Sequence, residues 1–238
     1  MKNSILYILL WFFAVFSLCS SVVRAQDCSA KEKRSFFDGK YGIENELYKG
    51  KIFYVDRSIF SGHPFLGDDT LSYCSILING TKFVDQKIRY DIYSQNFVLT
   101  FVDPIGAQRQ IVLNANQVDT VYIGGSVFIK NPVPAIRSDF VQLIHQGTIS
   151  CYVAWQKEKE VKSTAQKSGY AYSKENPQRY IVYDSVLYRF KNKREFLSVF
   201  PSQKRNEIKK YLSSNHVRMK KVTTDQLEKL IGYIETVL

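Results

Sequence analysis

The sequence has few of the residues that most often build catalytic or metal centres. It has four cysteines and three histidines in 238 residues. No two cysteines have the C-x-x-C spacing of a redox pair or a zinc site. His63, His145 and His216 lie far apart in the chain, so a metal site would have to be assembled by the fold. Neither a G-x-S-x-G elbow nor a phosphate-binding glycine loop is present. We therefore predict no catalytic residues, no metal ion and no cofactor.

The N-terminal 25 residues have the layout of a secretory signal peptide. A short basic start precedes an apolar run from Ile5 to Leu18, and Val23-Arg24-Ala25 supplies small residues before a cleavage point. We predict cleavage after Ala25 and export to the periplasm or the cell surface. Two alternatives stay open: retention as a membrane anchor, because Ile5 to Val23 spans 19 residues, and lipid attachment at Cys19.

Acidic side chains are scarce relative to basic ones. The chain has 33 Lys and Arg against 22 Asp and Glu, a net charge of +11. Residues 189–221 hold eleven basic residues against Glu195 and Glu207, and therefore most of the excess. Such a surface either attracts polyanions and anionic membranes or is a solvated face that keeps the protein soluble. On the first reading, the candidate polyanion-binding residues are Lys204, Arg205, Lys209 and Lys210. We expect no nucleic acid as a partner of an exported protein.

Alternating apolar residues from residue 64 onward predict an antiparallel β-domain. Short strands are separated by turn sequences such as Asn79-Gly80, which favours a type I′ turn. We predict an α+β protein with a β-meander, barrel-like or sandwich-like, of about eight to ten strands over residues 64–156. A mobile polar loop is expected at 157–178, and a leader segment that docks loosely or only in part at 26–63.

Residues 179–238 are expected to form a small hairpin followed by two or three short basic helices. The apolar spacing there changes from two residues to three or four, over 194–199, 202–212 and from Thr223 or Thr224 onward. Helices this short need packing on the sheet to be stable. The hairpin and helices should therefore complete the β-domain and not form a separate body.

The strand predicted over Ile88 to Tyr93 offers the best candidate for ligand contact. Its more polar face carries Arg89, Asp91 and Tyr93, with the apolar residues on the other face. These three are the candidate ligand-binding residues. The alternative is a cross-strand ion pair and an aromatic side chain packed under the helices.

The same strand carries a resemblance to a known group of proteins. Ile88-Arg89-Tyr90-Asp91-Ile92-Tyr93, with Pro64-Phe65-Leu66-Gly67-Asp68-Asp69 upstream and Val118-Asp119-Thr120-Val121-Tyr122 downstream, resembles exported β-rich proteins of Bacteroidota. Those proteins carry an L-R-Y-N/D-x-Y strand and a basic, short-helical C-terminus. Here Ile88 stands where they often have Leu. The resemblance is clearest over residues 64–130. It implies bacterial export and a β-plus-helix layout, and it implies no activity, ligand or catalytic residue.

Two other pairs of residues can be interpreted either as catalytic groups or as structural ones. Cys151 and His145 lie on either side of a hairpin turn, so they are a candidate thiol nucleophile and base, although a cysteine in an apolar strand is typical of a core. Adjacent carboxylates at Asp68 and Asp69 favour a turn or a cap, because neighbouring strand residues point in opposite directions. The pairing of Cys28, Cys74 and Cys151 is left open.

The leading hypothesis is a non-catalytic, exported binding or structural module of the bacterial cell envelope. Its partner would be an envelope protein or a polyanion. One alternative is a hydrolase assembled by the fold, which a polar pocket holding two or more of these residues would favour: His63, His145, Asp68, Asp91 and Cys151. The other is a protein that associates with polyanions, or peripherally with a membrane surface, through the basic segment 189–221.

Overall fold

The computed structural model describes residues 47–56, 59–103, 105–163 and 168–238. The strands in these residues are β1 Gly50–Ile52, β2 Ile59–Ser61, β3 Ser72–Ile78, β4 Thr81–Asp91, β5 Asn96–Val102, β6 Gln108–Leu113, β7 Val118–Ile123, β8 Ser126–Lys130, β9 Phe140–His145, β10 Ile149–Gln156, β11 Lys159–Ser163, β12 Ser168–Tyr172, β13 Asn176–Tyr183 and β14 Val186–Phe190. The helices are α3 Lys193–Ser198, α4 Arg205–Ser214 and α5 Thr224–Val237, with a 3-10 turn, η1, at Met219–Lys221. Within this described part, each helix is too short or too polar to cross a lipid bilayer. The predicted signal peptide, its cleavage point after Ala25, Cys19 and Cys28 lie outside the described residues.

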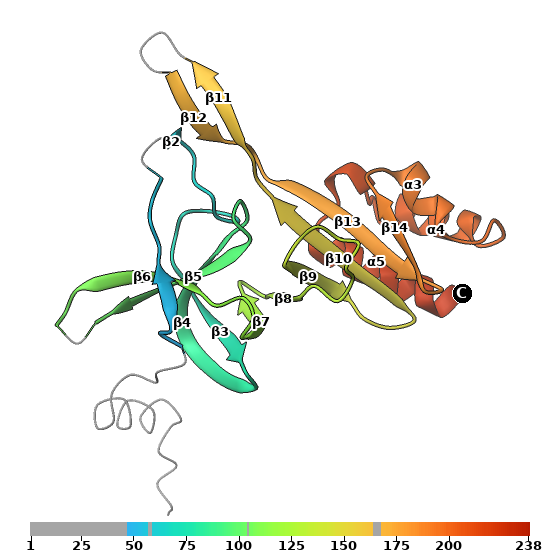
Figure 1. The fold of residues 1–238 in the computed structure, drawn as a ribbon. Helices are drawn as coiled ribbons and strands as arrows, with labels where there is room; N and C mark the ends of the chain where they lie inside the picture. The colour runs from blue at the N-terminus through green and yellow to red at the C-terminus, as the bar shows by residue number, and fades with distance from the viewer. Residues whose placement is uncertain (1–46, 57–58, 104, 164–167) are drawn as a thin grey trace, which may run out of the picture. The chain divides into compact units, whose positions relative to one another are not determined.

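Eleven of the described strands form one antiparallel sheet in the order β1-β6-β5-β4-β3-β7-β8-β9-β10-β13-β14 (Figure 1). Most neighbours in this sheet are joined by hairpins, and the helices follow the last strand. The predicted α+β class and antiparallel meander are therefore confirmed. β1 and β14 are the two edges of the sheet. The sheet is thus not closed, and the barrel-like alternative is wrong.

The β3–β4 hairpin shows how local sequence sets this topology. Asn79 and Gly80 have φ angles of 47° and 76°, as the predicted type I′ turn requires. Beyond the turn, Asp85 also has a positive φ of 57°, and the register with β3 shifts between Cys74 and Ile76. The chain continues through this bulge as the single strand β4, which includes most of the strand predicted over Ile88 to Tyr93.

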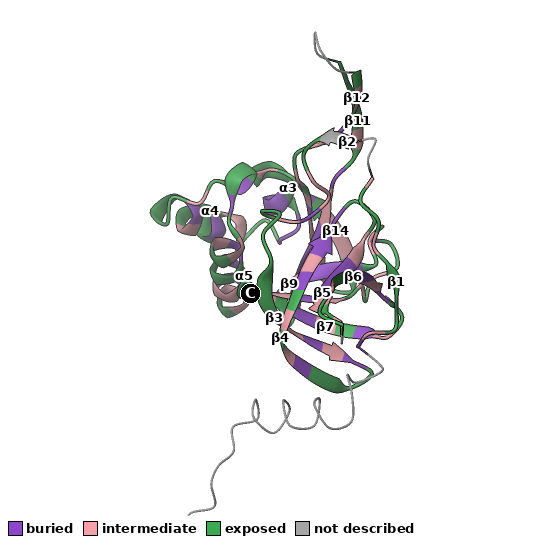
Figure 2. Ribbon diagram, turned by 90° about the vertical axis from the view of Figure 1, so that its left-hand side faces the viewer, coloured by how far each residue is buried: buried purple, intermediate pink, exposed green. Residues whose placement is uncertain are grey.

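Two large apolar cores lie on the main sheet, one in each half. The first is built by β3 to β8 and includes these fully buried side chains: Phe83, Ile88, Phe97, Leu99 and Phe128. The second lies where α3, α4 and α5 cover β9, β10, β13 and β14, with the exposed sides of the helices turned away from the sheet (Figure 2). Trp155 packs against both cores.

The helices begin and end close to where the apolar spacing predicts. Thr223 is the N-cap of α5, and its hydroxyl accepts a hydrogen bond from Gln226 N while the Gln226 side chain accepts one from Thr223 N. The predicted apolar stripe of this helix is buried at Leu227, Leu230, Ile231 and Ile234. Helix α4 begins at Arg205 rather than at the predicted position 202.

Two of the expected irregular segments contain strands. The leader expected at 26–63 contributes β1 to the main sheet and β2 to a small second sheet, in which β2 lies parallel to β12. The segment 157–178, expected to be a polar loop, instead contains strands, because β11 and β12 pair there over five residues and continue the β10–β13 ribbon (Figure 1). Tyr170 and Tyr172 alternate with the fully buried Ala171, a strand pattern too short to stand out among the charged residues.

Candidate functional site

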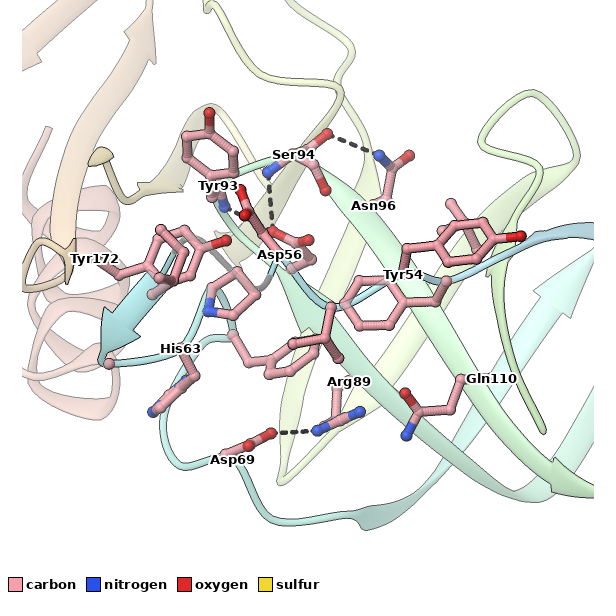
Figure 3. A pocket seen from close by; sticks show the side chains of 18 of the residues that line it. Tyr54, Asp56, His63, Asp69, Arg89, Tyr93, Ser94, Asn96, Gln110 and Tyr172 are labelled. Carbon is pink, nitrogen blue, oxygen red and sulfur yellow. Dashed lines mark hydrogen bonds and ion pairs between the residues drawn. The ribbon is translucent and has the colours of Figure 1, made fainter. Parts of the chain in front are cut away.

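A cavity of about 600 Å³ opens beside the end of β4, where separate parts of the chain meet (Figure 3). One wall comes from β4 and the β4–β5 turn. A second comes from the extended segment 53–56 and the loop 62–65, and a third from β11 and β12. The cavity is lined by all three residues predicted as ligand contacts: Arg89, Asp91 and Tyr93.

Backbone pairing places the loop 62–65 against β4. Phe65 forms an isolated antiparallel bridge with Asp91, and Ile92 N donates a hydrogen bond to the carbonyl oxygen of Pro64 at 3.0 Å. The loop therefore extends the sheet locally without becoming a full strand. Its residues line the cavity.

Lys157 fixes this loop from the opposite side. The residue is 9% exposed, and its ammonium group donates hydrogen bonds to the carbonyl oxygens of Phe65 at 2.7 Å and His63 at 3.1 Å. Burial lowers the pKa of Lys157, as expected for a cation taken out of water. This lysine lies at the bend between β10 and β11, so it ties the ribbon to the cavity wall.

The guanidinium of Arg89 lines the inner wall of the cavity. Its side chain is 10% exposed, forms an ion pair with Asp69, and lies 3.9 Å from the centre of the Phe65 ring. Nε of Arg89 is buried and has no hydrogen-bond partner among the described residues. An unpaired buried N–H costs about 1–3 kcal/mol. A ligand acceptor group would satisfy this edge of the guanidinium, which makes Arg89 the strongest candidate contact in the cavity.

His63 supplies a second unpaired polar atom at the same cavity. Its Nδ1 is buried and has no hydrogen-bond partner within the described ranges. The imidazole is stacked near the Phe65 ring, with 6.2 Å between the ring centres and 21° between the planes. Arg89 and His63 therefore flank the same phenyl ring, and both carry buried nitrogen atoms without a partner.

Aromatic rings and one ion pair close the cavity on the ribbon side. The Tyr93 and Tyr172 rings lie 5.4 Å apart, and Lys159 Nζ lies 4.9 Å from the centre of the Tyr93 ring. Lys159 also pairs with Asp56, at 2.5 Å from Nζ to Oδ2, and this hydrogen bond raises the pKa of the lysine. The pair joins β11 to the segment that follows β1.

Asp91 has a structural task in this arrangement. The residue is 4% exposed, and its Oδ1 accepts hydrogen bonds from the backbone N–H groups of Tyr93 at 3.0 Å and Ser94 at 2.9 Å. The carboxylate thus caps the β4–β5 turn. The cross-strand ion pair considered for this face is also not formed with Asp91, because the partner of Arg89 is Asp69.

The candidate thiol nucleophile Cys151 lies in an apolar core. Cys151 lies opposite His145 in the β9–β10 pairing, but it is fully buried, and burial raises the pKa of its thiol. His145 Nε2 lies 2.9 Å from Glu235 Oε2 on α5. In the described part of the chain, no three His, Cys, Asp or Glu side chains are grouped as metal ligands.

The predicted polyanion-binding residues have unequal surroundings. Arg205 donates hydrogen bonds to the carbonyl oxygens of Phe200 at 2.8 Å and Ser198 at 3.3 Å, so its guanidinium closes the link between α3 and α4. Lys204 is half-buried at the N-cap of α4, and Lys209 and Lys210 are exposed on that helix. None of the four lines the cavity beside β4.

The cavity residues that escaped the sequence-based prediction include Asp56, Lys159 and Tyr172. They lie in the segments expected to be a leader and a loop, and the alternation of Tyr170 and Tyr172 was the signal that could have placed one of them on a strand. No protein-family model, curated protein or solved structure matches the chain. The site is therefore understood from its own geometry.

Proposed function

We propose that this chain is a non-catalytic binding module, exported to the bacterial cell envelope, that holds a small ligand or the end of a partner chain in the cavity beside β4. The unpaired edge of the Arg89 guanidinium carries this proposal. Pockets that bind ligands are typically apolar, with a few polar groups that fix orientation. Arg89 and His63 are such groups, set against the rings that line the same cavity: Phe53, Tyr54, Phe65, Tyr93 and Tyr172.

This lining favours a flat apolar ligand that carries an acidic group. The rings offer broad apolar contact, and a guanidinium binds carboxylates through two parallel hydrogen bonds. The Asp69 side chain, 55% exposed, is the present partner of Arg89. A ligand carboxylate would share or replace it.

The test is binding of a panel of aromatic carboxylates, including N-acetyltyrosine and indole-3-acetate, measured by saturation-transfer NMR and calorimetry. Arg89→Gln should weaken binding about tenfold or more, because a hydrogen bond to a charged group is lost. Arg109→Gln is the matched control, since Arg109 forms a similar ion pair with Asp103 at 2.8 Å outside the cavity. No binding by any member of the panel, or equal loss in both variants, would contradict the proposal.

Export is part of the same proposal. It is supported by the basic, apolar and small-residue order of residues 1–25 and by the resemblance to exported Bacteroidota proteins. Mass spectrometry of the protein from the periplasm or the cell surface should give a chain that begins at Gln26. A full-length chain in the cytoplasm would contradict export.

The hydrolase alternative has one observation in its favour, because His63 and Asp91 line the same cavity. Binding remains the better supported function, since Oδ1 of Asp91 accepts hydrogen bonds from two backbone N–H groups and so caps the β4–β5 turn. Hydrolysis of p-nitrophenyl esters that is lost in His63→Gln, with the fold intact by circular dichroism, would establish the enzyme instead.

A further inference from the structure

A second hollow lies away from the cavity beside β4, between the start of α3 and the turn η1. Two segments line its volume of about 530 Å³: residues 192–194 and residues 217–221. They are separated in the chain by the whole of α4, and the fold brings them together. Five of the eight lining residues are basic and none is acidic: Lys193, Arg194, Arg218, Lys220 and Lys221. We call this hollow the basic groove.

The positive charge of the basic groove is not neutralised within the described chain. All five side chains belong to exposed residues, and none makes an ion pair or a hydrogen bond with a described residue. The nearest acidic residue in the sequence, Glu195, uses its carboxylate on Lys191 N at 2.7 Å and Asn192 Nδ2 at 2.6 Å. Gathered like charges repel one another, so this arrangement favours negative charge supplied from outside.

The walls of the basic groove are mainly apolar. Val217 is half-buried and Met219 is buried, and the methylene stems of the lysines and arginines complete the lining. Long basic side chains commonly lay their stems on apolar surface while their charged ends reach an interface. A small hydrated anion would leave this apolar surface in water. A layer of anionic lipid presents many phosphate groups side by side, so it can meet the gathered charged ends of all five side chains at once.

We propose that the basic groove is a docking site for the surface of an anionic lipid bilayer. The groove lies within the basic segment 189–221 but does not include the four residues singled out from the sequence, because Arg205 is engaged with backbone carbonyl groups and the α4 lysines do not line the groove. It is also independent of the cavity beside β4, with which it shares no residue.

The test measures how the full chain distributes between two vesicle populations mixed together. One population is phosphatidylcholine alone, and the other is phosphatidylcholine and phosphatidylglycerol in equal parts. Any contribution of the apolar residues 5–23 would be common to both populations, so the ratio between them reports the electrostatic contribution. Each basic side chain near an anionic bilayer contributes about a factor of five in affinity. Lys193→Gln, Lys220→Gln and Lys221→Gln together should therefore lower the ratio about a hundredfold.

The control is an equal change of charge within the same basic segment: Lys204→Gln, Lys209→Gln and Lys210→Gln together. It should change the ratio far less, and high salt should lower the ratio for the unaltered protein. Three outcomes would overturn the proposal: an equal or greater loss in the control, no loss in the groove variant, or heparin binding as tight as vesicle binding, which would assign the basic groove to a soluble polyanion.

Discussion

Single buried polar side chains position the cavity wall. The ammonium group of Lys157 donates hydrogen bonds to the carbonyl oxygens of His63 and Phe65, and no backbone N–H of the described residues donates to either oxygen. Lys157→Met keeps the volume of the side chain but leaves both carbonyl oxygens without this hydrogen-bond donor. We expect it to lower the free energy of unfolding by about 1–2 kcal/mol. Urea denaturation measures the loss, and Lys162→Met on the exposed part of β11 should show none.

Glu235 ties α5 to the β9–β10 hairpin in a similar way. Its carboxylate accepts hydrogen bonds from Ile149 N at 2.7 Å and from Thr148 Oγ1 at 2.8 Å, and it lies against His145. The bond from Ile149 is the main cause that lowers the pKa of Glu235 from 4.5 to about 2. The ionised carboxylate therefore stabilises the fold. Its contribution is complete above about pH 4.5 and is lost as the pH falls toward 2.

Glu235→Gln should lower the free energy of unfolding by about 1–2 kcal/mol at neutral pH, because the charged acceptor is lost. The deficit should shrink as the pH falls from 4.5 toward 2, where the native carboxylate also becomes protonated. Denaturant titrations across this range measure both effects. Glu228→Gln, on the exposed side of the same helix, is the control. A deficit that stays constant with pH would contradict the role given to the charge.

Gly147 is required by the same contact. A Cβ atom built on Gly147 would overlap both carboxylate oxygens of Glu235. Gly147→Ala should therefore displace the carboxylate and destabilise the protein by an amount similar to Glu235→Gln. Because the two changes remove one interaction, the double variant should be less destabilised than the sum of the single variants. If urea denaturation shows that the losses of unfolding free energy in the two single variants add up in the double variant, the glycine acts in another way.

At the scale of elements, α5 depends on packing more than on its own helical preference. Leu230 is fully buried in the core shared with β9 and β10, together with Ile231 and Ile234. Leu230→Ala should lower the free energy of unfolding by about 2–5 kcal/mol, through lost transfer energy and the cavity left behind. Thermal unfolding followed by circular dichroism measures the change. Glu228→Ala should leave the midpoint nearly unchanged, and an equal effect of both variants would mean that helix propensity decides the outcome.

The elements that the sequence predicts well are those whose burial alternates regularly. Ile88 and Tyr90 in β4 and Ile92 directly after it are buried, as the alternation from Ile88 to Tyr93 indicates. This alternation also places Arg89 and Tyr93 on the side where the cavity lies. The strands β11 and β12 lie outside the main cores and are mostly exposed, so they leave little apolar signal. They pair with each other as neighbours in the chain, but the third strand of their small sheet, β2, is distant in sequence, and local patterns cannot supply that partner.

The cavity was predictable only in part for the same reason. Arg89 belongs to a regular strand, but its partners Asp69 and Phe65 come from an irregular loop. Asp56 and Lys159 meet across more than a hundred residues of sequence. The residues of a site assembled from loops and short strands have no fixed spacing in the sequence, so no sequence motif identifies such a site.

For the whole described molecule, the continuous sheet links two cores that could otherwise unfold separately. Trp155 packs against both, and its indole N–H donates a hydrogen bond to Gln142 Oε1 at 2.8 Å. The carbonyl oxygen of Trp155 accepts a hydrogen bond from Gln95 Nε2 at 2.9 Å, which reaches back to the β4–β5 turn. The two halves thus share one side chain, one polar network and the β8–β9 pairing.

We therefore expect residues of both cores to unfold in a single transition. Leu99→Ala in the core of β3 to β8 and Leu230→Ala beneath α5 should lower the same calorimetric midpoint, because neither half can lose its packing without exposing the sheet edge of the other. Trp155→Ala should weaken this coupling by removing the shared side chain. In the Trp155→Ala background, Leu230→Ala should give two unfolding transitions at different temperatures. Hydrogen exchange should assign the transition at the lower temperature to the helical half. Two transitions in the unaltered protein would show that the cores are independent, and a single transition in the double variant would place the coupling in the sheet instead of in Trp155.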